Sequence, residues 1–142
     1  MNDTRLDDRY RTYLLQMSLE QDTLVEVGAL TEHRFASGCY LYVGSARSGL
    51  TARLTRHHAD EKTKHWHIDY LVHHARITAV FVSGVPECEL NRRLRDRYQT
   101  EQPVKNFGSS DCDCHAHLAL LTNPEGFGGQ ELKQLDPDTF RP

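Results

Sequence analysis

The longest unbroken apolar run in this chain is Cys39–Val43, and a glycine stands at each end of it. A membrane-spanning helix needs about 20 consecutive apolar residues, so we expect no contact with a bilayer interior. A short apolar run with glycine boundaries is typical of a buried β-strand. The 142 residues are enough for one ordinary domain, whose core must come from short strands and helices.

Apolar periodicity predicts the elements of that domain. Alternation predicts a strand over Tyr10–Leu19, and Thr23–Leu30 is expected to return against it as a hairpin. Further strands are expected at Gly38–Gly44, Ile77–Val85 and His117–Leu121, and helices at Gly49–Ala59, at His65–Ala75 and after Pro86. This order predicts an α+β fold, a small, mostly antiparallel sheet flanked by helices. We expect one domain over residues 1–122 and a flexible tail over residues 123–142, where Pro and Gly recur.

Charge is unevenly distributed along the sequence. The net charge of -3 argues against a protein held to nucleic acid by bulk charge. Between Gly44 and His67, however, basic residues outnumber acids: Arg47, Arg53, Arg56, Lys62 and Lys64 against Asp60 and Glu61. The N-terminal segment MNDTRLDDRYR is charged and lacks the apolar stretch of a signal peptide. We therefore expect a cytoplasmic protein with its four cysteines reduced and with a local basic face.

The strongest local pattern is Tyr42-Val43-Gly44-Ser45, followed by Leu50, Arg53 and His57. A tyrosine near the end of a strand and a glycine turn here lead into a helix. Residues three and four apart share a helical face, so Leu50, Arg53 and His57 are expected on one side. The arginine fork suits a phosphate, and a nearby tyrosine or histidine can move a proton to or from attacking water.

The same residues carry a family resemblance. Tyr42-Val43-Gly44 with Leu50, Arg53 and His57 resembles the second half of the GIY-YIG nuclease motif. Arg11-Thr12-Tyr13 stands where the first half is expected, with arginine in place of the usual glycine. More specifically, the sequence looks like an uncharacterised bacterial and archaeal branch of that superfamily. Four segments carry this likeness, which covers about Tyr10 to Leu121: GCYLYVGSA from Gly38, HWHIDYL from His65, Glu87-Cys88, and FGSSDCDC from Phe107.

The resemblance implies a compact α+β endonuclease that cuts DNA phosphodiesters with one divalent metal ion, Mg²⁺ or Mn²⁺, in repair or in the processing of structured DNA. By similarity, Tyr13 and Tyr42 border the scissile phosphate and one of them is the general base. Arg53 stabilises the transition state, and His57 belongs to the same catalytic group. The metal-binding glutamate is Glu87 or Glu89, and we predict Glu87 because Leu90 follows it by three residues and shares its helical side.

Two further groups of polar side chains allow two interpretations each. His65 and Asp69 are i, i+4 partners, and His67 faces elsewhere. The three residues either line a nucleic-acid cleft or orient a catalytic tyrosine, or the two histidines cap the helix start or hydrogen-bond the adjoining loop. Cys112, Cys114 and His117 have the ligand types of a structural zinc site, although paired zinc cysteines normally stand two to four residues apart. The alternative is a tight loop in which serine and aspartate side chains satisfy backbone donors.

Two functions therefore remain to be compared. The first is the metal-dependent endonuclease. The second is a nucleic-acid-binding module that keeps the same fold without turnover, which the negative net charge and Arg11 favour. Binding that weakens steeply with salt is expected of both functions, whereas cutting in Mg²⁺ or Mn²⁺ is expected of the enzyme alone.

Overall fold

The computed structural model of the chain describes residues 10–45, 49–59, 67–108, 116–123, 127 and 132–140. Its strands are β1 (Thr12–Leu19), β2 (Thr23–Glu26), β3 (Glu32–Phe35), β4 (Gly38–Ser45), β5 (Arg76–Ser83), β6 (Thr100–Glu101), β7 (Leu118–Leu121) and β8 (Lys133–Leu135). The α-helices of this described part are α2 (Leu50–His58), α3 (His67–Val72) and α4 (Glu87–Arg97). Short 3₁₀ turns lie at Gly28–Leu30 and Pro137–Phe140.

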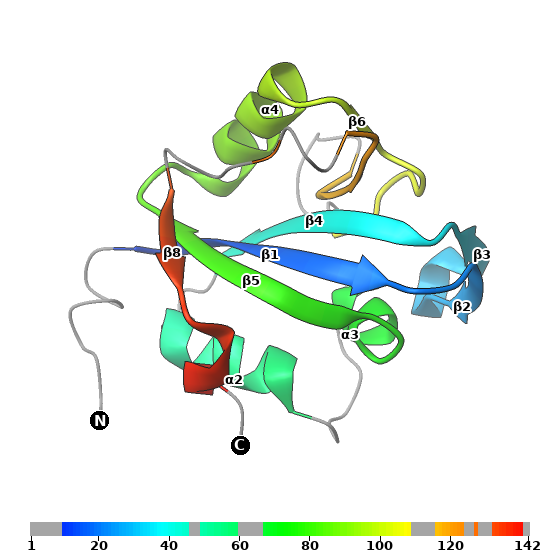
Figure 1. The fold of residues 1–142 in the computed structure, drawn as a ribbon, viewed down its shortest axis with the longest axis horizontal. Coiled ribbons are helices and arrows are strands. Elements are labelled where there is room, and N and C mark those ends of the chain that lie inside the picture. The colour runs from blue at the N-terminus through cyan, green and yellow to red at the C-terminus, as the bar shows by residue number, and fades with distance from the viewer. Residues whose placement is uncertain are drawn as a thin grey trace.

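A six-stranded sheet forms the centre of the molecule, with the strand order β6-β7-β4-β1-β5-β8 (Figure 1). Every neighbouring pair in it is antiparallel. The predicted α+β fold with a mostly antiparallel sheet is therefore confirmed. None of the described helices has the length and hydrophobicity needed to span a bilayer.

Helices cover both faces of this sheet, with α2 and α3 on one face and α4 on the other (Figure 1). Successive side chains of a strand point to opposite faces, so β1 contributes to two separate core layers. Tyr13 packs in the layer that contains Leu54 of α2 and Ile68 of α3. Leu14 packs in the layer that contains Leu90 of α4. Burial of each such aliphatic side chain contributes about 1.5–3 kcal/mol to folding.

Antiparallel pairing brings the starts of two helices to one edge of the sheet. Thr12, the first residue of β1, lies opposite Ser45 at the end of β4 and opposite Ser83 at the end of β5. Helix α2 follows β4 in the chain, and α4 follows β5. The beginning of β1 and the first turns of α2 and α4 therefore share this edge, where the predicted site residues lie.

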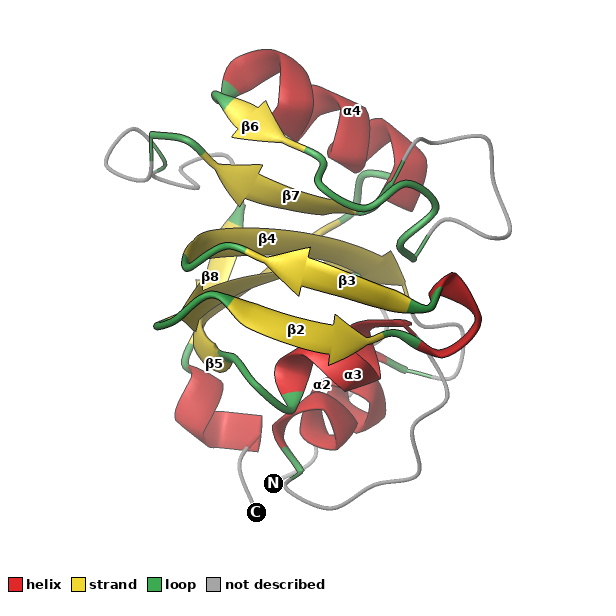
Figure 2. Ribbon diagram, turned by 90° about the vertical axis from the view of Figure 1, so that its right-hand side faces the viewer, coloured by secondary structure: helices red, strands yellow, loops and turns green. Residues whose placement is uncertain are grey.

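The pairing of β2 differs from the expected hairpin. Thr23–Leu30 was predicted to return against the first strand, but β2 pairs with β3 in a separate two-stranded sheet. Figure 2 shows β2 and β3 side by side on the near side of the molecule. A strand has two hydrogen-bonding edges, and β4 and β5 occupy both edges of β1. No edge of β1 is left for β2.

The described part of residues 123–142 differs from the predicted flexible tail. Strand β8 pairs with β5 and forms the outer strand of the main sheet. The ring of Phe127 packs against Phe81 and Tyr98, with ring centroids 5.7 and 4.9 Å apart. Isolated apolar side chains of this segment thus reach the core layer beneath α4. The Pro and Gly content of the segment does not predict this packing.

Candidate active site

Three aromatic rings from three elements meet at the start of β1. Tyr13 of β1 lies 6.3 Å from Tyr42 of β4 and 5.3 Å from His57 of α2, measured between ring centroids. The Tyr42 and His57 centroids are 6.4 Å apart. All three side chains are buried, Tyr13 completely and Tyr42 with 7% of its surface exposed. The fold therefore brings together three residues that the sequence analysis selected as catalytic.

The hydroxyl of Tyr13 has two polar neighbours on α2. It lies 2.7 Å from Nε2 of His57, and the Arg53 side chain also hydrogen-bonds it. Arg53 and His57 are four residues apart and share one helical face. Nη1 of Arg53 donates to the backbone oxygen of Ser45 at 3.0 Å, which holds the half-buried guanidinium against the end of β4. The phenol oxygen thus accepts from a cation and is hydrogen-bonded to Nε2, and the tautomer of His57 decides which of these two atoms donates.

Both tyrosine hydroxyls keep their protons at neutral pH. Burial raises the pKa of Tyr13 above its ordinary value of 10, more than the charge and hydrogen bond of Arg53 lower it. Burial raises the pKa of Tyr42 as well, and the neighbouring Tyr13 and Glu87 act in the same direction. A protonated phenol is a hydrogen-bond donor, and it can take a proton from water only by releasing its own.

Gly44 makes room for the ring of Tyr13. The two residues lie directly opposite each other in the pairing of β1 with β4. A Cβ atom at position 44 would lie 2.5 Å from Cζ of Tyr13, closer than side-chain contacts allow. The glycine of the Tyr-Val-Gly motif is therefore required by cross-strand packing, because its hydrogen faces the aromatic ring.

Glu87 adds a carboxylate to this edge from the first turn of α4. Its Oε2 lies 2.5 Å from Nδ1 of His117, and the side chains of the pair are 25% and 0% exposed. Burial raises the pKa of Glu87, but hydrogen bonds with His117 and Ser45 and the charges of His117 and Arg53 outweigh it. The pKa is therefore held below its ordinary value of 4.5, and Glu87 is ionised at neutral pH.

The Glu87 carboxylate suits a hard divalent cation. Mg²⁺ is commonly bound through one or two carboxylates, with water and substrate phosphates completing its octahedron. Glu87 is ionised and partly exposed, as such a ligand has to be. No group of three His, Cys, Asp or Glu side chains among the described residues is placed to hold a metal ion. The alternative glutamate, Glu89, forms an exposed ion pair with Arg93 at 3.4 Å.

His117 contacts α4 through both ring nitrogens. Its Nδ1 faces Glu87, and its Nε2 lies 3.7 Å from Sγ of Cys88. The other predicted zinc ligands, Cys112 and Cys114, lie outside the described residues. Sequence reasoning did not select Cys88 and did not join His117 to Glu87, because the contact between Cys88 and His117 spans 29 positions. Local spacing carries no signal of such a contact.

Of the candidate cleft residues His65, His67 and Asp69, the two that the structure describes have structural contacts. The fully buried carboxylate of Asp69 receives two hydrogen bonds from Arg56, at 2.6 and 2.9 Å, which join α3 to α2. Nδ1 of His67 accepts from the backbone N–H of Gly108 at 2.9 Å, and its ring packs on Phe107. Burial lowers the pKa of His67, which favours the neutral acceptor form. These contacts favour the loop-binding interpretation; His65 lies outside the described residues.

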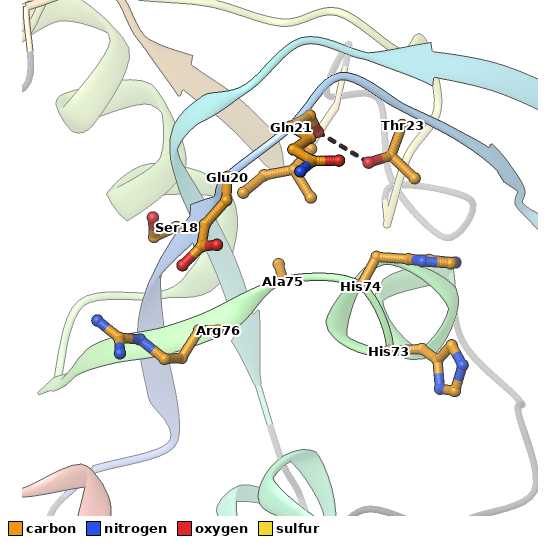
Figure 3. A pocket seen from close by; sticks show the side chains of 9 residues that line it. Ser18, Glu20, Gln21, Thr23, His73, His74, Ala75 and Arg76 are labelled. Atoms are coloured by element: carbon orange, nitrogen blue, oxygen red, sulfur yellow. Dashed lines mark hydrogen bonds between the residues drawn. The ribbon is translucent and has the colours of Figure 1, made fainter.

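A polar cavity of about 350 Å³ lies near the other end of β1 (Figure 3). Its lining includes Glu20, His73, His74 and Arg76. Figure 3 shows the Arg76 side chain extending away from both histidines, so the arginine and the histidines do not converge on one point. The cavity also includes Leu19, about 20 Å along the strand from Tyr13 at roughly 3.3 Å per residue. The cluster at the start of β1 is therefore the better candidate site.

Comparison with known proteins addresses the family of the chain. No curated protein and no solved structure matches it significantly. One family model, described as a domain of unknown function, DUF123, matches residues 12–132. The match begins at the first residue of β1 and includes Tyr13, Tyr42, Arg53, His57 and Glu87. Because it spans most of the sequence, the chain belongs to the DUF123 family.

Proposed function

We propose that this chain is a divalent-metal-dependent endonuclease of the GIY-YIG type, acting on DNA. One observation carries the proposal. The side chains that the resemblance implies come from β1, β4, α2 and α4 and meet at one edge of the sheet: Tyr13, Tyr42, Arg53, His57 and Glu87. Phosphodiester hydrolysis needs a cation for developing charge, a route for a proton and a ligand for a metal ion, and this cluster has all three.

Arg53 and Glu87 are the charged members of the cluster. The guanidinium of Arg53 is only half-buried, so it can meet a phosphate while Nη1 remains bound to Ser45. It would stabilise the charge that develops on the phosphoryl oxygens. Glu87 would hold Mg²⁺ or Mn²⁺, and a bound ion of this kind supplies Lewis-acid polarisation of a phosphoryl oxygen.

Tyr13 and His57 form the proposed route for the proton. The Tyr13 hydroxyl accepts a proton from the attacking water as its own proton passes to Nε2 of His57 over 2.7 Å. The phenol then ends the step neutral, which its raised pKa requires. Tyr42, which is also protonated, would donate a hydrogen bond to the phosphate.

A nucleic-acid-binding module without turnover is the second candidate. The complete burial of Tyr13 favours it, because water has to reach the hydroxyl before that hydroxyl can take a proton. In such a module Arg53 would hold a phosphate and no bond would be cleaved. The two candidates share the site and differ only in turnover.

Cleavage of labelled DNA separates the two candidates. Duplex, single-stranded and branched DNA would be incubated with Mg²⁺, Mn²⁺ or EDTA. We expect metal-dependent cutting that falls about 100-fold or more in Arg53→Ala and Glu87→Gln, the scale seen when one transition-state contact is removed. Arg93→Ala and Glu89→Gln are matched controls on the exposed side of α4 and should cut normally.

The outcomes of this assay distinguish three cases. Cutting that survives both Arg53→Ala and Glu87→Gln would overturn the assigned site. Salt-sensitive binding by folded parent protein without any cutting would establish the binding module instead. Absence of both binding and cutting would reject DNA as the substrate.

A further inference from the structure

Helix α4 carries a concentration of positive charge. Arg92, Arg93, Arg95 and Arg97 lie on this helix, and all four side chains are exposed. The first half of α4 carries Glu87 and Glu89, whereas residues 92–97 hold the four arginines and one acid, Asp96. The second half of the helix is therefore a local basic surface on a chain whose net charge is -3. Such a surface is the usual electrostatic mark of a polyanionic partner.

The four arginines fall into two pairs with different surroundings. Arg93 forms its ion pair with Glu89, and Arg97 lies over the ring of Tyr98, 5.7 Å from its centroid. Arg92 and Arg95 have no such ion pair or ring contact with any part of the chain that the structure describes. These two guanidinium groups are therefore available to an external anion.

Helical geometry connects this second pair to the candidate active site. Cys88, Arg92 and Arg95 stand at i, i+4 and i+7, which places them along one side of α4. Sγ of Cys88 contacts His117, whose ring also holds Glu87. We call this row of side chains, Cys88, Arg92 and Arg95, the stripe. It begins beside Glu87 and runs along the helix away from it. At about 1.5 Å per residue, Glu87 to Arg95 covers roughly 12 Å, the axial rise of about three phosphates of one DNA strand.

We propose that Arg92 and Arg95 bind successive phosphates of the nucleic-acid strand and hold it along α4 on one side of Glu87. This inference rests on the proposed function, since it takes Glu87 as the point where the strand is cut. The guanidinium fork matches the phosphate geometry, and the positive stripe complements the charge of the backbone. Phosphate contacts carry no base information, so this surface positions the strand without selecting a sequence.

DNA binding in EDTA tests the inference without any cleavage. The anisotropy of labelled duplex and single-stranded DNA would be followed over a series of salt concentrations. The variant R92Q/R95Q is compared with R93Q/R97Q, which removes the same charge from the same helix. We expect R92Q/R95Q to raise Kd about tenfold or more and to reduce the slope of log K against log salt by about 2. The control pair should change Kd by about twofold or less.

Each other outcome overturns the inference. Equal losses of DNA affinity in the two double variants would show a general charge effect. An unchanged DNA affinity in R92Q/R95Q would show that the stripe does not touch DNA. Competition by polyglutamate as effective as that by DNA would indicate an acidic protein partner. Parent protein that does not bind DNA would also reject the inference.

The cleavage assay keeps this inference separate from the proposed function. Binding that depends on Arg92 and Arg95, without cutting in Mg²⁺ or Mn²⁺, would support the stripe and reject the endonuclease. Metal-dependent cutting by the parent protein, together with an unchanged Kd in R92Q/R95Q, would support the endonuclease and reject the stripe. Thermal unfolding should be unchanged in both double variants, because all four side chains are exposed.

Discussion

Tyr13 and Leu14 are neighbours on β1, yet they belong to core layers of different character. The layer beneath α4 is mainly apolar, although α4 also buries Asn91, whose side chain donates to the backbone oxygen of Ala116. Its apolar members are Leu14, Leu41, Val43, Ala79, Phe81, Leu90, Leu94 and Leu121. The layer beneath α2 and α3 contains apolar side chains too, but it also buries the hydroxyl of Tyr13, the imidazole of His57 and the carboxylate of Asp69. Each of these polar groups has a partner, because a buried polar group without one costs about 1–3 kcal/mol. The comparison teaches that the layer beneath α2 and α3 buries the tyrosine and histidine of the candidate site, whereas the α4 side is mainly apolar inside and contributes Glu87 from the first turn of its helix.

Removing Arg56 should have the largest effect on stability. Arg56→Met leaves the buried carboxylate of Asp69 without its bidentate partner, and such losses cost about 3–5 kcal/mol. Arg34→Met is the matched control, since the Arg34–Asp22 pair is exposed and solvent screens it, so its removal should change the free energy of unfolding much less. Urea unfolding measures both values. Equal destabilisation by the two variants would contradict the assigned role of the buried pair.

Leu14→Ala should destabilise the protein without harming the site. Truncating a fully buried leucine costs about 2–5 kcal/mol, and the cavity forms in the apolar layer beneath α4. We expect the DNA cleavage rate per folded molecule to stay near that of the parent. Cleavage should be measured below the unfolding transition, where both proteins are folded. A large loss of rate there would show that the two layers are coupled.

Tyr13→Phe, in contrast, should reduce the DNA cleavage rate strongly. The ring still packs beside Gly44, while His57 loses its hydrogen bond, at a cost of about 1–3 kcal/mol. Cleavage should fall about 100-fold, the lower range for loss of general base catalysis. Tyr40→Phe is the control because its hydroxyl donates to Ala36 within the same layer, and its cleavage rate should not change. A similar loss of rate in both variants would remove Tyr13 from the mechanism.

The smallest expected effect is a pH dependence of the stability that the Glu87 carboxylate contributes. The pKa of Glu87 is below its ordinary value of 4.5 in the folded chain, so the charged form stabilises folding above that value. This stabilisation is lost as the pH falls through the lower, folded-state pKa. The Tm difference between parent and Glu87→Gln should therefore be constant down to about pH 4.5 and shrink below it. A difference that grows in acid would contradict the assigned ionisation.

Local pattern was sufficient for much of the fold. Strand alternation predicts β1 and β5, glycine boundaries predict β4, and helical spacing predicts α2 and α4. These signals are local because a side chain's face depends only on its own element. The meeting of Tyr13, Tyr42 and Glu87 was expected from the family resemblance alone, since no spacing in the sequence brings three separate elements together.

Contacts between distant segments could not be predicted in this way. The separate sheet of β2 and β3 depends on β4 and β5 occupying both edges of β1, which is a property of the complete fold. The Arg56–Asp69 pair joins two helices 13 positions apart in sequence. His117 was grouped with nearby cysteines, but in the fold it contacts Glu87 and Cys88 on α4. In each case the partner is decided by tertiary packing.

The contact between Gly44 and Tyr13 has a consequence for how these two positions change through evolution. The ring at position 13 occupies the space that any side chain at position 44 would need. A larger residue at 44 therefore requires a smaller one at 13 or a wider spacing between β1 and β4. Substitutions at these two positions are expected to be correlated, so that Tyr13 and Gly44 are inherited, or lost, together.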